Sequence, residues 1–487
     1  MTRRITAIAA LLAGLLTVGA QAATFNVTSQ ADSGTGTLRA AIISANATPD
    51  TPHTIAFVAP FTVGGSVNLL SLLPTITAKD LTIMGGTIRP TISGQGVQQI
   101  LRVGENNINL SISNLEFSRG HAAQKGGCIA EVSNTPPTVG TLRLDFVIFS
   151  ECSASATSLA YGGAIYWPRN GGDLQINHSR FSANSVTATA TTGQSQSGGG
   201  AVYAHSDVTI TNSLFENNEA ITVSTITGGL ASGGALALGG VDRIFEISGS
   251  TFLGNSASPG AAAGYGGAVH QLCDHCILEI RRSYFRDNSA THGAGIKTQK
   301  FGAGPDDVLT ILTNSSFVGN HAAVAGGAVH TFSTRLSLSN NTFHNNGAMN
   351  GAHVNFGSST SLMIAKANLF APTASGSACG SSVTLPSPHL IAANLFSDAS
   401  CGAISAGALP NAPLGTITID ETPGQVGVVQ FTGSAVIDSI SDGALCQPID
   451  ARSQPRPTDG DGDGLALCDV GAYEHQGAWL FRDGFEN

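Results

Sequence analysis

The sequence is poor in charged residues. Asp, Glu, Lys and Arg make up 11% of the 487 residues, whereas about a quarter is usual in soluble domains. The formal net charge is -10, and no run of Lys and Arg interrupts the chain. Because binding to phosphates requires clustered basic side chains, this composition argues against nucleic acid as the main partner.

Long apolar runs are also scarce, and the one clear example stands at the N-terminus. Arg3 and Arg4 precede an apolar stretch from Ile5 to Val18, and Ala20-Gln21-Ala22 follows as a small-residue cleavage site. This order is typical of a secretory signal peptide over residues 1–22. A membrane anchor is the alternative, but the apolar core is short and ends in small residues. We therefore expect an exported, extracellular or surface-held protein with no transmembrane segment after signal removal.

An exported protein reaches an oxidising compartment, where an even number of cysteines, here eight, predicts disulfides. Proximity in the sequence suggests the pairs Cys128–Cys152, Cys273–Cys276, Cys379–Cys401 and Cys446–Cys468. Spacing alone does not fix this connectivity. Cys273 and Cys276, with His270 nearby, could instead hold zinc, but a second ligand pair at zinc-finger spacing is missing.

What the chain has in abundance is a repeated phrase. Its first half is a Gly-Gly-Ala-Val-like start at Gly126, Gly162, Gly199, Gly233, Gly266 and Gly326, with looser copies at Gly293 and Gly351. Its second half is a Ser-x-Phe-x-x-Asn-like unit with Phe117, Phe149, Phe181, Phe215, Phe252, Phe285, Phe317, Phe343, Phe370 and Phe396. A period of this length indicates a solenoid, in which each repeat buries its apolar face against its neighbours.

Alternation within one repeat predicts the kind of solenoid. In Gly266-Gly267-Ala268-Val269-His270, Val269 faces one side and His270 the other. A second alternating strand precedes each phenylalanine, as in Leu278-Glu279-Ile280. Three residues after six of the phenylalanines stands an asparagine, which tolerates left-handed turns and can bond its copy in the next coil. These are Asn184, Asn218, Asn255, Asn288, Asn320 and Asn346. We predict an all-β, right-handed parallel β-helix.

The repeat resembles the polymorphic outer membrane protein repeat and related pectin-lyase-like β-helices over about residues 100–400. Asp32 to Ile42 is similar to the N-terminal segment of CSLREA-type exported proteins, with Gly36, Thr37 and Ala40 departing from that pattern. Asp459 to Gly464 and Cys468 to Glu474 resemble the end of choice-of-anchor Q proteins, and Phe481 to Glu486 resembles tails of exported Gram-negative proteins. The resemblance implies a surface-associated bacterial β-helix and specifies no reaction.

The flanking segments complete the predicted domain organisation. Residues 23–100 form an N-terminal cap and the first coils, 101–400 the β-helix repeats, and 401–487 an irregular C-terminal cap and tail. Leu38 to Ala47 suits a short amphipathic helix with Leu38, Ala41, Ile42 and Ala45 on one side. Such caps cover the open edges of a solenoid, which otherwise promote aggregation.

The first candidate site is the column one residue after the inward Val or Ile of each repeat. It contains Ala130, Tyr166, Tyr203, Ala237, His270, Lys297, His330 and Asn355. In register these side chains form a stripe whose Tyr, His, Lys and Asn members can stack on and hydrogen-bond sugar rings. The alternative is a solvated strand face without a ligand. A polysaccharide or cell-surface glycan is the partner that this stripe predicts.

The second candidate is Asp459, Asp461 and Asp463, whose D-x-D-x-D-G spacing suits structural Ca²⁺. The twelfth position of a full calcium loop is Val470 instead of Glu, so Asp469 or Glu474 would complete the site. A flexible Asp-Gly turn is the alternative reading.

Catalysis is the third possibility. β-Helix lyases abstract a proton with Arg or Lys, and Arg282, Lys297, His270 and His330 fall in neighbouring repeats. Arg281, Arg286 and Asp287 fall in the same neighbouring repeats, so all of these side chains could converge on one face. No paired carboxylates, nucleophile motif or cofactor motif is evident in the repeats.

We therefore expect adhesion or glycan binding without catalysis, with a polysaccharide lyase or epimerase as the alternative. An autotransporter passenger is a third reading, but no set of lipid-facing alternating strands follows the repeats.

Overall fold

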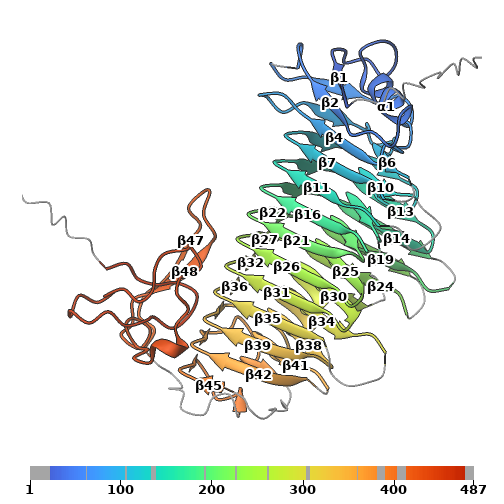
Figure 1. Cartoon of the computed structure of the whole chain (residues 1–487). Coiled ribbons are helices and arrows are strands. Elements are labelled where there is room, and N and C mark those ends of the chain that lie inside the picture. Colours follow the sequence, from blue (N-terminus) through green and yellow to red (C-terminus); the bar gives the residue numbers. More distant parts are fainter. Residues whose placement is uncertain are drawn as a thin grey trace, which may run out of the picture.

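The computed structural model shows a long parallel β-helix with a smaller unit beside its later coils (Figure 1). It describes residues 22–477 except 62, 105–106, 133–138, 170, 191–192, 225–227, 260–262, 303–307, 359, 381–389 and 403–412. The expected signal segment before residue 22 and the tail from Phe481 to Glu486 lie outside the described residues. In the described part, no helix is long and apolar enough to cross a membrane.

Each coil contributes in turn to four parallel sheets, which we number I to IV in chain order. Sheet I contains β1 (Ala23–Val27), β2 (His53–Phe57), β4 (Asp80–Met84), β7 (Asn109–Ser113), β11 (Leu142–Asp145), β16 (Asp173–Asn177), β21 (Asp207–Thr211), β26 (Ile244–Ser248), β31 (Ile277–Arg281), β35 (Leu309–Thr313), β39 (Arg335–Ser339), β42 (Ser361–Lys366) and β45 (Leu390–Ala392). Sheet II contains β3 (Ser66–Asn68), β5 (Thr91–Ser93), β8 (Glu116–Ser118), β12 (Ile148–Ser150), β17 (Arg180–Ser182), β22 (Leu214–Glu216), β27 (Thr251–Leu253), β32 (Tyr284–Arg286), β36 (Ser316–Val318), β40 (Thr342–His344), β43 (Leu369–Phe370) and β46 (Leu395–Phe396).

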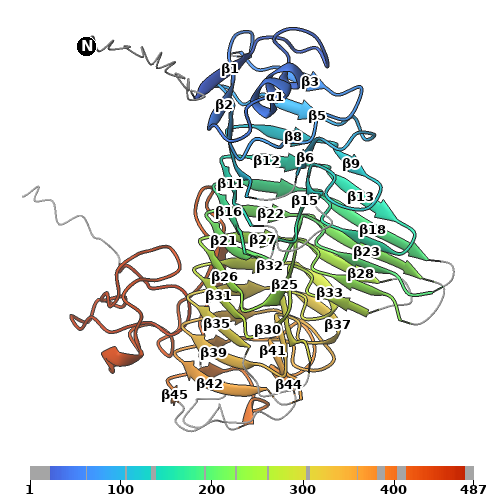
Figure 2. The ribbon, with the colours of Figure 1, turned by 45° about the vertical axis from the view of Figure 1, so that its right-hand side comes forward.

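Sheet III forms a flange that projects from the middle coils (Figure 2). It contains β9 (His121–Ala122), β13 (Ser153–Ala156), β14 (Leu159–Tyr161), β18 (Ser185–Ala190), β19 (Gln196–Gly198), β23 (Glu219–Ser224), β24 (Leu230–Ser232), β28 (Ser256–Pro259), β29 (Ala263–Tyr265), β33 (Ser289–His292) and β37 (His321–Ala325). Four coils send one strand out and a second strand back, and both rows meet at β33. The repeat pattern predicted one strand after each glycine pair and one before each phenylalanine, and it did not predict this flange.

Sheet IV follows the glycine pair of each coil. It contains β6 (Leu101–Val103), β10 (Ile129–Glu131), β15 (Ile165–Trp167), β20 (Val202–Ala204), β25 (Leu236–Val241), β30 (Val269–Asp274), β34 (Ile296–Lys300), β38 (Val329–Phe332), β41 (Val354–Phe356) and β44 (Cys379–Gly380). The predicted inward residues of these strands are all buried, namely Ile129, Ile165, Val202, Leu236, Val269, Ile296, Val329 and Val354.

The phenylalanines form one continuous stack through the core. Neighbouring rings from Phe117 to Phe396 lie 4.5 to 5.2 Å apart between centroids and are nearly parallel. Every ring is buried. The stack confirms that the Phe period marks successive coils, because residues one period apart are partners in sheet II.

The predicted asparagine ladder is also present and fully buried. The Nδ2 of Asn218 donates to the Oδ1 of Asn255 at 2.9 Å and to the carbonyl of Phe181, and the pattern continues from Asn184 to Asn346. The left-handed conformation, however, belongs to the preceding residue, as at Asn217 with φ 52°. The ladder asparagines therefore act through their amides, which satisfy buried backbone groups that would otherwise cost stability.

The two glycines of each pair have different roles. The first adopts a positive φ, for example 68° at Gly199, which a residue with a Cβ rarely adopts. The second lies against the next coil, since a Cβ on Gly200 would stand 2.0 Å from the carbonyl oxygen of Gly234. The pair therefore turns the chain and allows neighbouring coils to approach at this corner.

The expected N-terminal helix is α1 (Leu38–Asn46), and its buried residues are Leu38, Ala41, Ile42 and Ala45, as predicted. Thr37 caps it by accepting a hydrogen bond from the amide of Ala40. Its buried side belongs to the same apolar core as β1 and β2.

Three of the suggested disulfides are formed: Cys128–Cys152, Cys379–Cys401 and Cys446–Cys468. They are compatible with an exported protein. The fourth pair is wrong in this structure, because Cys273 and Cys276 are buried free thiols. Each sulfur has a hydrogen bond of its own, from Gln271 to Cys273 and from Cys276 to the carbonyl of Asp274.

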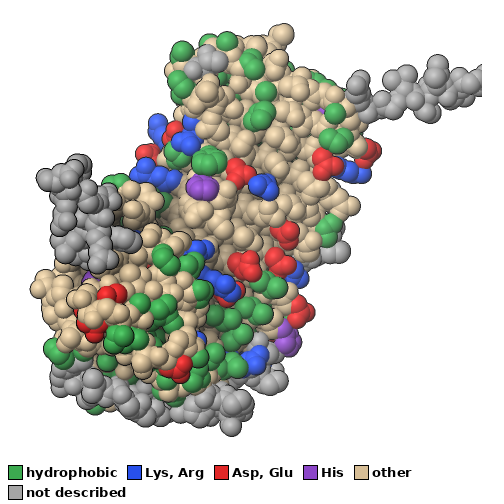
Figure 3. Space-filling model, turned by 60° about the vertical axis from the view of Figure 1, so that its left-hand side comes forward, with side chains coloured by type: hydrophobic (Ala, Val, Ile, Leu, Met, Phe, Trp, Pro, Cys, Tyr) green, Lys and Arg blue, Asp and Glu red, His purple; other side chains and the backbone are tan. Residues whose placement is uncertain are grey.

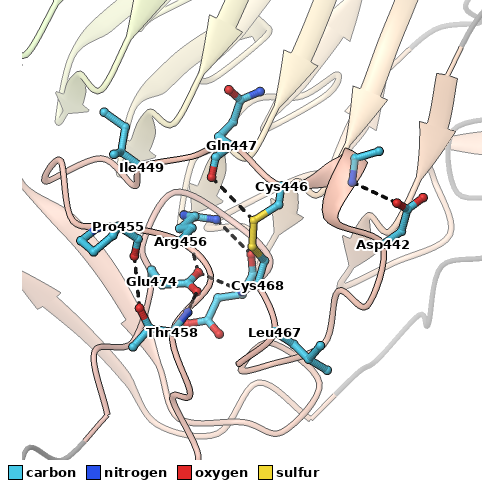
Figure 4. The surroundings of a disulfide bond; sticks show 12 residues. Asp442, Cys446, Gln447, Ile449, Pro455, Arg456, Thr458, Leu467, Cys468 and Glu474 are labelled. Atoms are coloured by element: carbon cyan, nitrogen blue, oxygen red, sulfur yellow. Dashed lines mark hydrogen bonds and ion pairs between the residues drawn. A yellow bond between two sulfur atoms is a disulfide. The ribbon is translucent and has the colours of Figure 1, made fainter. Parts of the chain in front are cut away.

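Residues 413–477 form the C-terminal unit, which lies along the flank of the later coils (Figure 1). It contains the hairpin β47 (Ile417–Asp420) and β48 (Val428–Phe431) and the short 3-10 helix η2 (Gly443–Leu445). Its apolar side chains pack on sheet II between Tyr284 and Leu395. The Cys446–Cys468 disulfide and the buried Arg456–Glu474 ion pair lie at its centre (Figure 4).

Candidate functional site

Two columns of side chains face each other across the glycine corner. The column after the glycine pair is in the predicted register, since Tyr166 pairs with Tyr203, His270 with Lys297, and His330 with Asn355. The column before the pair consists of Lys125, Tyr161, Gly198, Ser232, Tyr265, His292, Ala325 and Asn350. We call the space between these columns the tyrosine groove.

The flange changes the environment of the predicted stripe. An open strand face was expected, but His270, Lys297, His330 and Asn355 are buried, with 2%, 3%, 8% and 5% of their surface exposed. The return strands of the flange cover this face, as shown by the hydrogen bond between Ser232 of β24 and Nδ1 of His270. Tyr166 and Tyr203 are the half-buried members of the column.

The early half of the groove is aromatic. The ring of Tyr161 lies 4.5 Å from that of Tyr203 and 6.4 Å from that of Tyr166, measured between centroids. The Nζ of Lys125 stands 4.9 Å above the ring of Tyr166. Burial raises the pKa of Tyr166 to about 12 and also raises that of Tyr161 and Tyr203. All three phenols are therefore neutral hydrogen-bonding groups on apolar rings near neutral pH.

A pocket of about 100 Å³ lies beside these rings. Tyr161, Tyr203 and His205 line it together with Gln196, Ser232 and His270. Since one water molecule occupies about 30 Å³ of liquid, the pocket admits a substituent of a ligand and not a whole chain. A polymer would therefore lie over the tyrosine rings and insert one group.

The later half of the groove is basic. The Nζ of Lys297 lies 5.7 Å from the ring centroid of Tyr265 and 5.2 Å from that of Phe332. The rings of His292 and His330 are 5.4 Å apart beside it. Among the described residues, no carboxylate forms an ion pair with Lys297.

Burial favours the neutral forms of this basic group. It lowers the pKa of Lys297 to about 7. Burial, and secondarily the charge of Lys297, lowers the pKa of His270 to about 3 and that of His330 to about 2. Near neutral pH the groove thus contains unprotonated imidazoles next to a lysine that readily gives up its proton.

The predicted arginines do not join this cluster. Arg282 lies at the corner between sheets I and II, and its Nη1 donates to the hydroxyl of Ser453 in the C-terminal unit. Arg286 pairs with Glu421 of the same unit and with Asp287, whereas Arg281 pairs with Glu279 on the strand surface. The expected convergence with Lys297, His270 and His330 is therefore wrong, because the side chains belong to different sheets.

The aspartate loop brings together a different set from the one predicted. Carboxylate oxygens of Asp459, Asp461 and Asp438 lie within 4.8 Å of one another. Asp463 instead accepts from the amide of Leu465, and Asp469 is buried against Asp438 N and His475. The backbone amides of Gly460 and Asp461 already donate to Asp438. The donor set suits a hard cation, although it is only part of the six to eight oxygens that Ca²⁺ takes.

Sequence reasoning missed Tyr161, Tyr265, His292 and Asp438. The first three share one position, immediately before the first glycine of the repeat. This shared position could have predicted that the three side chains lie in one column, because residues one period apart lie in register. Asp438 is 21 residues from Asp459 and belongs to no motif.

Comparison with known proteins adds little. No protein-family model matches the chain, and no curated protein matches it. Among solved structures, it is similar to a mannuronic acid specific polysaccharide family 6 lyase from human gut microbiota. The identity is 11% and the TM-score 0.26, over 80% of this chain and 91% of the other. A likeness of this size carries no argument about activity.

Proposed function

We propose that the protein is an exported, surface-associated β-helix that binds a carbohydrate chain along the tyrosine groove without cleaving it. The observation that carries the proposal is the cluster of Tyr161, Tyr166 and Tyr203, whose half-buried rings lie beside a small pocket that contains several polar groups. Aromatic faces attract the C–H groups of sugar rings, and the phenol hydroxyls supply hydrogen bonds.

The polar groups around the rings fit a ligand rich in hydroxyls. Gln196, Ser232 and His205 offer both donors and acceptors at the pocket. Lys125 lies over the ring of Tyr166 and supplies a cation at this end of the groove. Sites of this kind place a few polar groups on an apolar surface, and the polar groups set specificity.

Binding of the purified protein to immobilised neutral and acidic oligosaccharides tests this proposal. We expect Tyr203→Ala to weaken binding by about tenfold, because truncating a central aromatic anchor typically costs more than 1 kcal/mol. Phe301→Ala is the control, since Phe301 is 64% exposed on the same solenoid. Equal binding by the wild type and Tyr203→Ala contradicts the proposal.

A polysaccharide lyase is the second candidate, and the basic half of the groove is the observation that favours it. A lysine with a pKa of about 7 is suited to remove a proton beside a uronate carboxylate. The ring of Tyr265 lies 5.7 Å from the Nζ of Lys297, and a phenol can donate a proton. Arg282, the other candidate for the base, lies at another corner and hydrogen-bonds Ser453. For this reason we place binding first.

We further propose that Asp438, Asp459 and Asp461 hold a structural Ca²⁺ in the C-terminal unit. The ion would tie the loop around Asp459 to the segment around Asp438. Support comes from the closeness of the three carboxylates and from the preference of Ca²⁺ for such oxygens.

A further inference from the structure

A second cleft lies on the flank opposite the flange, between the solenoid and the tip of the β47–β48 hairpin. Its volume is about 800 Å³, within the usual range of ligand sites. One wall is the edge between sheets I and II, with Phe146, His178 and Leu214, and the other is the hairpin tip at residues 421–427. Figure 3 shows this flank, where charged side chains gather among hydrophobic ones.

Phe146 has a backbone conformation that its side chain does not favour. It occupies the left-handed turn between the two sheets with φ 55°. The same turn position has a positive φ in other coils, at Asn114, Asn212, Gly249 and Asn314, which accept it easily, and also at His178, Arg282, Ala367 and Ala393. Phe146 and His178 are therefore two neighbouring bulky residues at a turn position that Asn and Gly accept more readily.

The side chain of Phe146 gains little from burial that would offset this unfavourable conformation. It is 50% exposed, and its ring stacks on the exposed ring of His178 at 4.8 Å with an interplanar angle of 10°. Two hydrogen bonds hold the backbone of Phe146 in place. Arg89 donates to the carbonyl oxygen of Phe146, and the amide of Phe146 donates to the carbonyl oxygen of Asn177. The result is a rigid aromatic platform at the mouth of the cleft.

The polar groups of the cleft are balanced in charge. Arg180 pairs with Glu216, and Arg286 pairs with Glu421. Because each cation already has a carboxylate, the cleft does not favour a phosphate or another compact anion. Donors and acceptors side by side, next to an aromatic platform, fit a ligand with many hydroxyl groups.

The hairpin wall is built to lie close to the solenoid. Tyr284, 2% exposed, packs on Gly427, where a Cβ would stand 2.5 Å from the tyrosine ring. The Arg286–Glu421 pair fastens the start of the same loop. A ligand in the cleft would therefore touch two units that are already in contact, with little rearrangement.

We propose that this cleft is a second carbohydrate site, in which a sugar ring stacks on Phe146 and His178 and hydrogen-bonds the rims formed by Arg180 and the hairpin tip. It is distinct from the tyrosine groove, which lies between sheets III and IV. Because its walls belong to the solenoid and the C-terminal unit, ligand binding stabilises the docking of that unit. Two sites on opposite flanks allow one molecule to connect two glycan chains.

The experiment uses the full mature chain and immobilised cello-, xylo-, manno- and chito-oligosaccharides, with oligogalacturonate as the acidic probe. Binding is measured for the wild type, Phe146→Ala, His178→Ala and the groove variant Tyr203→Ala. Alanine keeps the Cβ at Phe146 and so leaves the backbone preference little changed; far-ultraviolet circular dichroism confirms folding. Hydrogen exchange of Val428–Phe431 is followed with and without the best-bound probe.

We expect Phe146→Ala to weaken binding of at least one probe by about five- to tenfold, as the loss of an aromatic contact does, while Tyr203→Ala keeps that binding. The same probe should slow exchange in β48 in the wild type and not in Phe146→Ala. Three results overturn the proposal: no probe is retained, Phe146→Ala binds like the wild type, or Tyr203→Ala alone abolishes all binding. Loss of all binding in Tyr203→Ala alone would leave the tyrosine groove as the one site. Loss of all binding in Phe146→Ala alone would refute the groove and keep the cleft.

Discussion

The solenoid and the C-terminal unit are stabilised in opposite ways. In the solenoid the same contact recurs in every coil, as in the phenylalanine stack and the asparagine ladder. The C-terminal unit has little regular structure, and contacts that do not repeat hold it: one disulfide, the buried Arg456–Glu474 pair, an apolar cluster packed on sheet II and a few hydrogen bonds to the coils. Loss of one contact should therefore spread along the solenoid but remain local in the C-terminal unit.

The largest effect is expected from a break in the phenylalanine stack. Phe252→Ala leaves a cavity between Phe215 and Phe285 and should lower the free energy of unfolding by about 3–5 kcal/mol. Urea denaturation followed by circular dichroism measures the change. Phe301→Ala, at an exposed position, should change it by less than about 0.5 kcal/mol; equal effects of both variants would show that the stack does not stabilise the coils.

The buried ion pair gives the matching test in the C-terminal unit. Arg456→Met leaves Glu474 unpaired at 0% exposure and should cost roughly 3 kcal/mol, confined to this unit. Hydrogen exchange should rise in residues 413–477 and stay unchanged in β16 and β21. Arg143→Met, which removes an exposed pair with Asp145, is the control. Faster exchange throughout the solenoid would contradict the local character of this unit.

Acid should weaken the solenoid through its buried histidines. The pKa values of His270 and His330 are lowered to about 3 and about 2, so between these values and about 6.5 the unfolded chain binds more protons than the folded one. The contribution of these two histidines should therefore be complete above about pH 6.5 and fall by up to about 1.4 kcal/mol per pH unit for each histidine below it. His330→Asn should flatten this slope in thermal melts, and an unchanged slope would contradict the role of this buried histidine.

Fold and site differ in how far the sequence predicts them. The period predicted the coils, the Phe stack and the register of Tyr203, His270 and Lys297, because a solenoid places residues one period apart in contact. The period did not predict the flange, because its strands, such as Ser185–Ala190, consist of small residues and contain no repeated phenylalanine. The burial of the stripe follows from the flange, so it was missed as well.

Contacts without a period were missed for the same reason. A second ladder, in which Ser179, Ser213, Ser250 and Ser283 bond one another's backbone, continues through Asn341 and Asn368. Each of these serines lies two residues before a repeated phenylalanine, so the repeat could have predicted this ladder. The docking of Arg282 on Ser453 joins residues 171 apart in sequence and has no such signal.

The smallest effect is expected from calcium in the C-terminal unit. If the loop binds the ion, a concentration of a hundred times the dissociation constant stabilises it by about 2.7 kcal/mol at most. A chelator should lower the melting temperature of the wild type and leave that of Asp459→Asn unchanged. An equal melt of the wild type with and without chelator removes the proposed calcium site.

Incubation of the mature protein with acidic and neutral polysaccharides tests the central claim most directly. Ultraviolet absorbance of unsaturated products and release of reducing ends are followed together with retention on the same polymers. We predict retention that Tyr203→Ala weakens, with no product from any polymer. Product that appears with the wild type and disappears with Lys297→Met would contradict a binding protein and assign the basic half of the groove to catalysis.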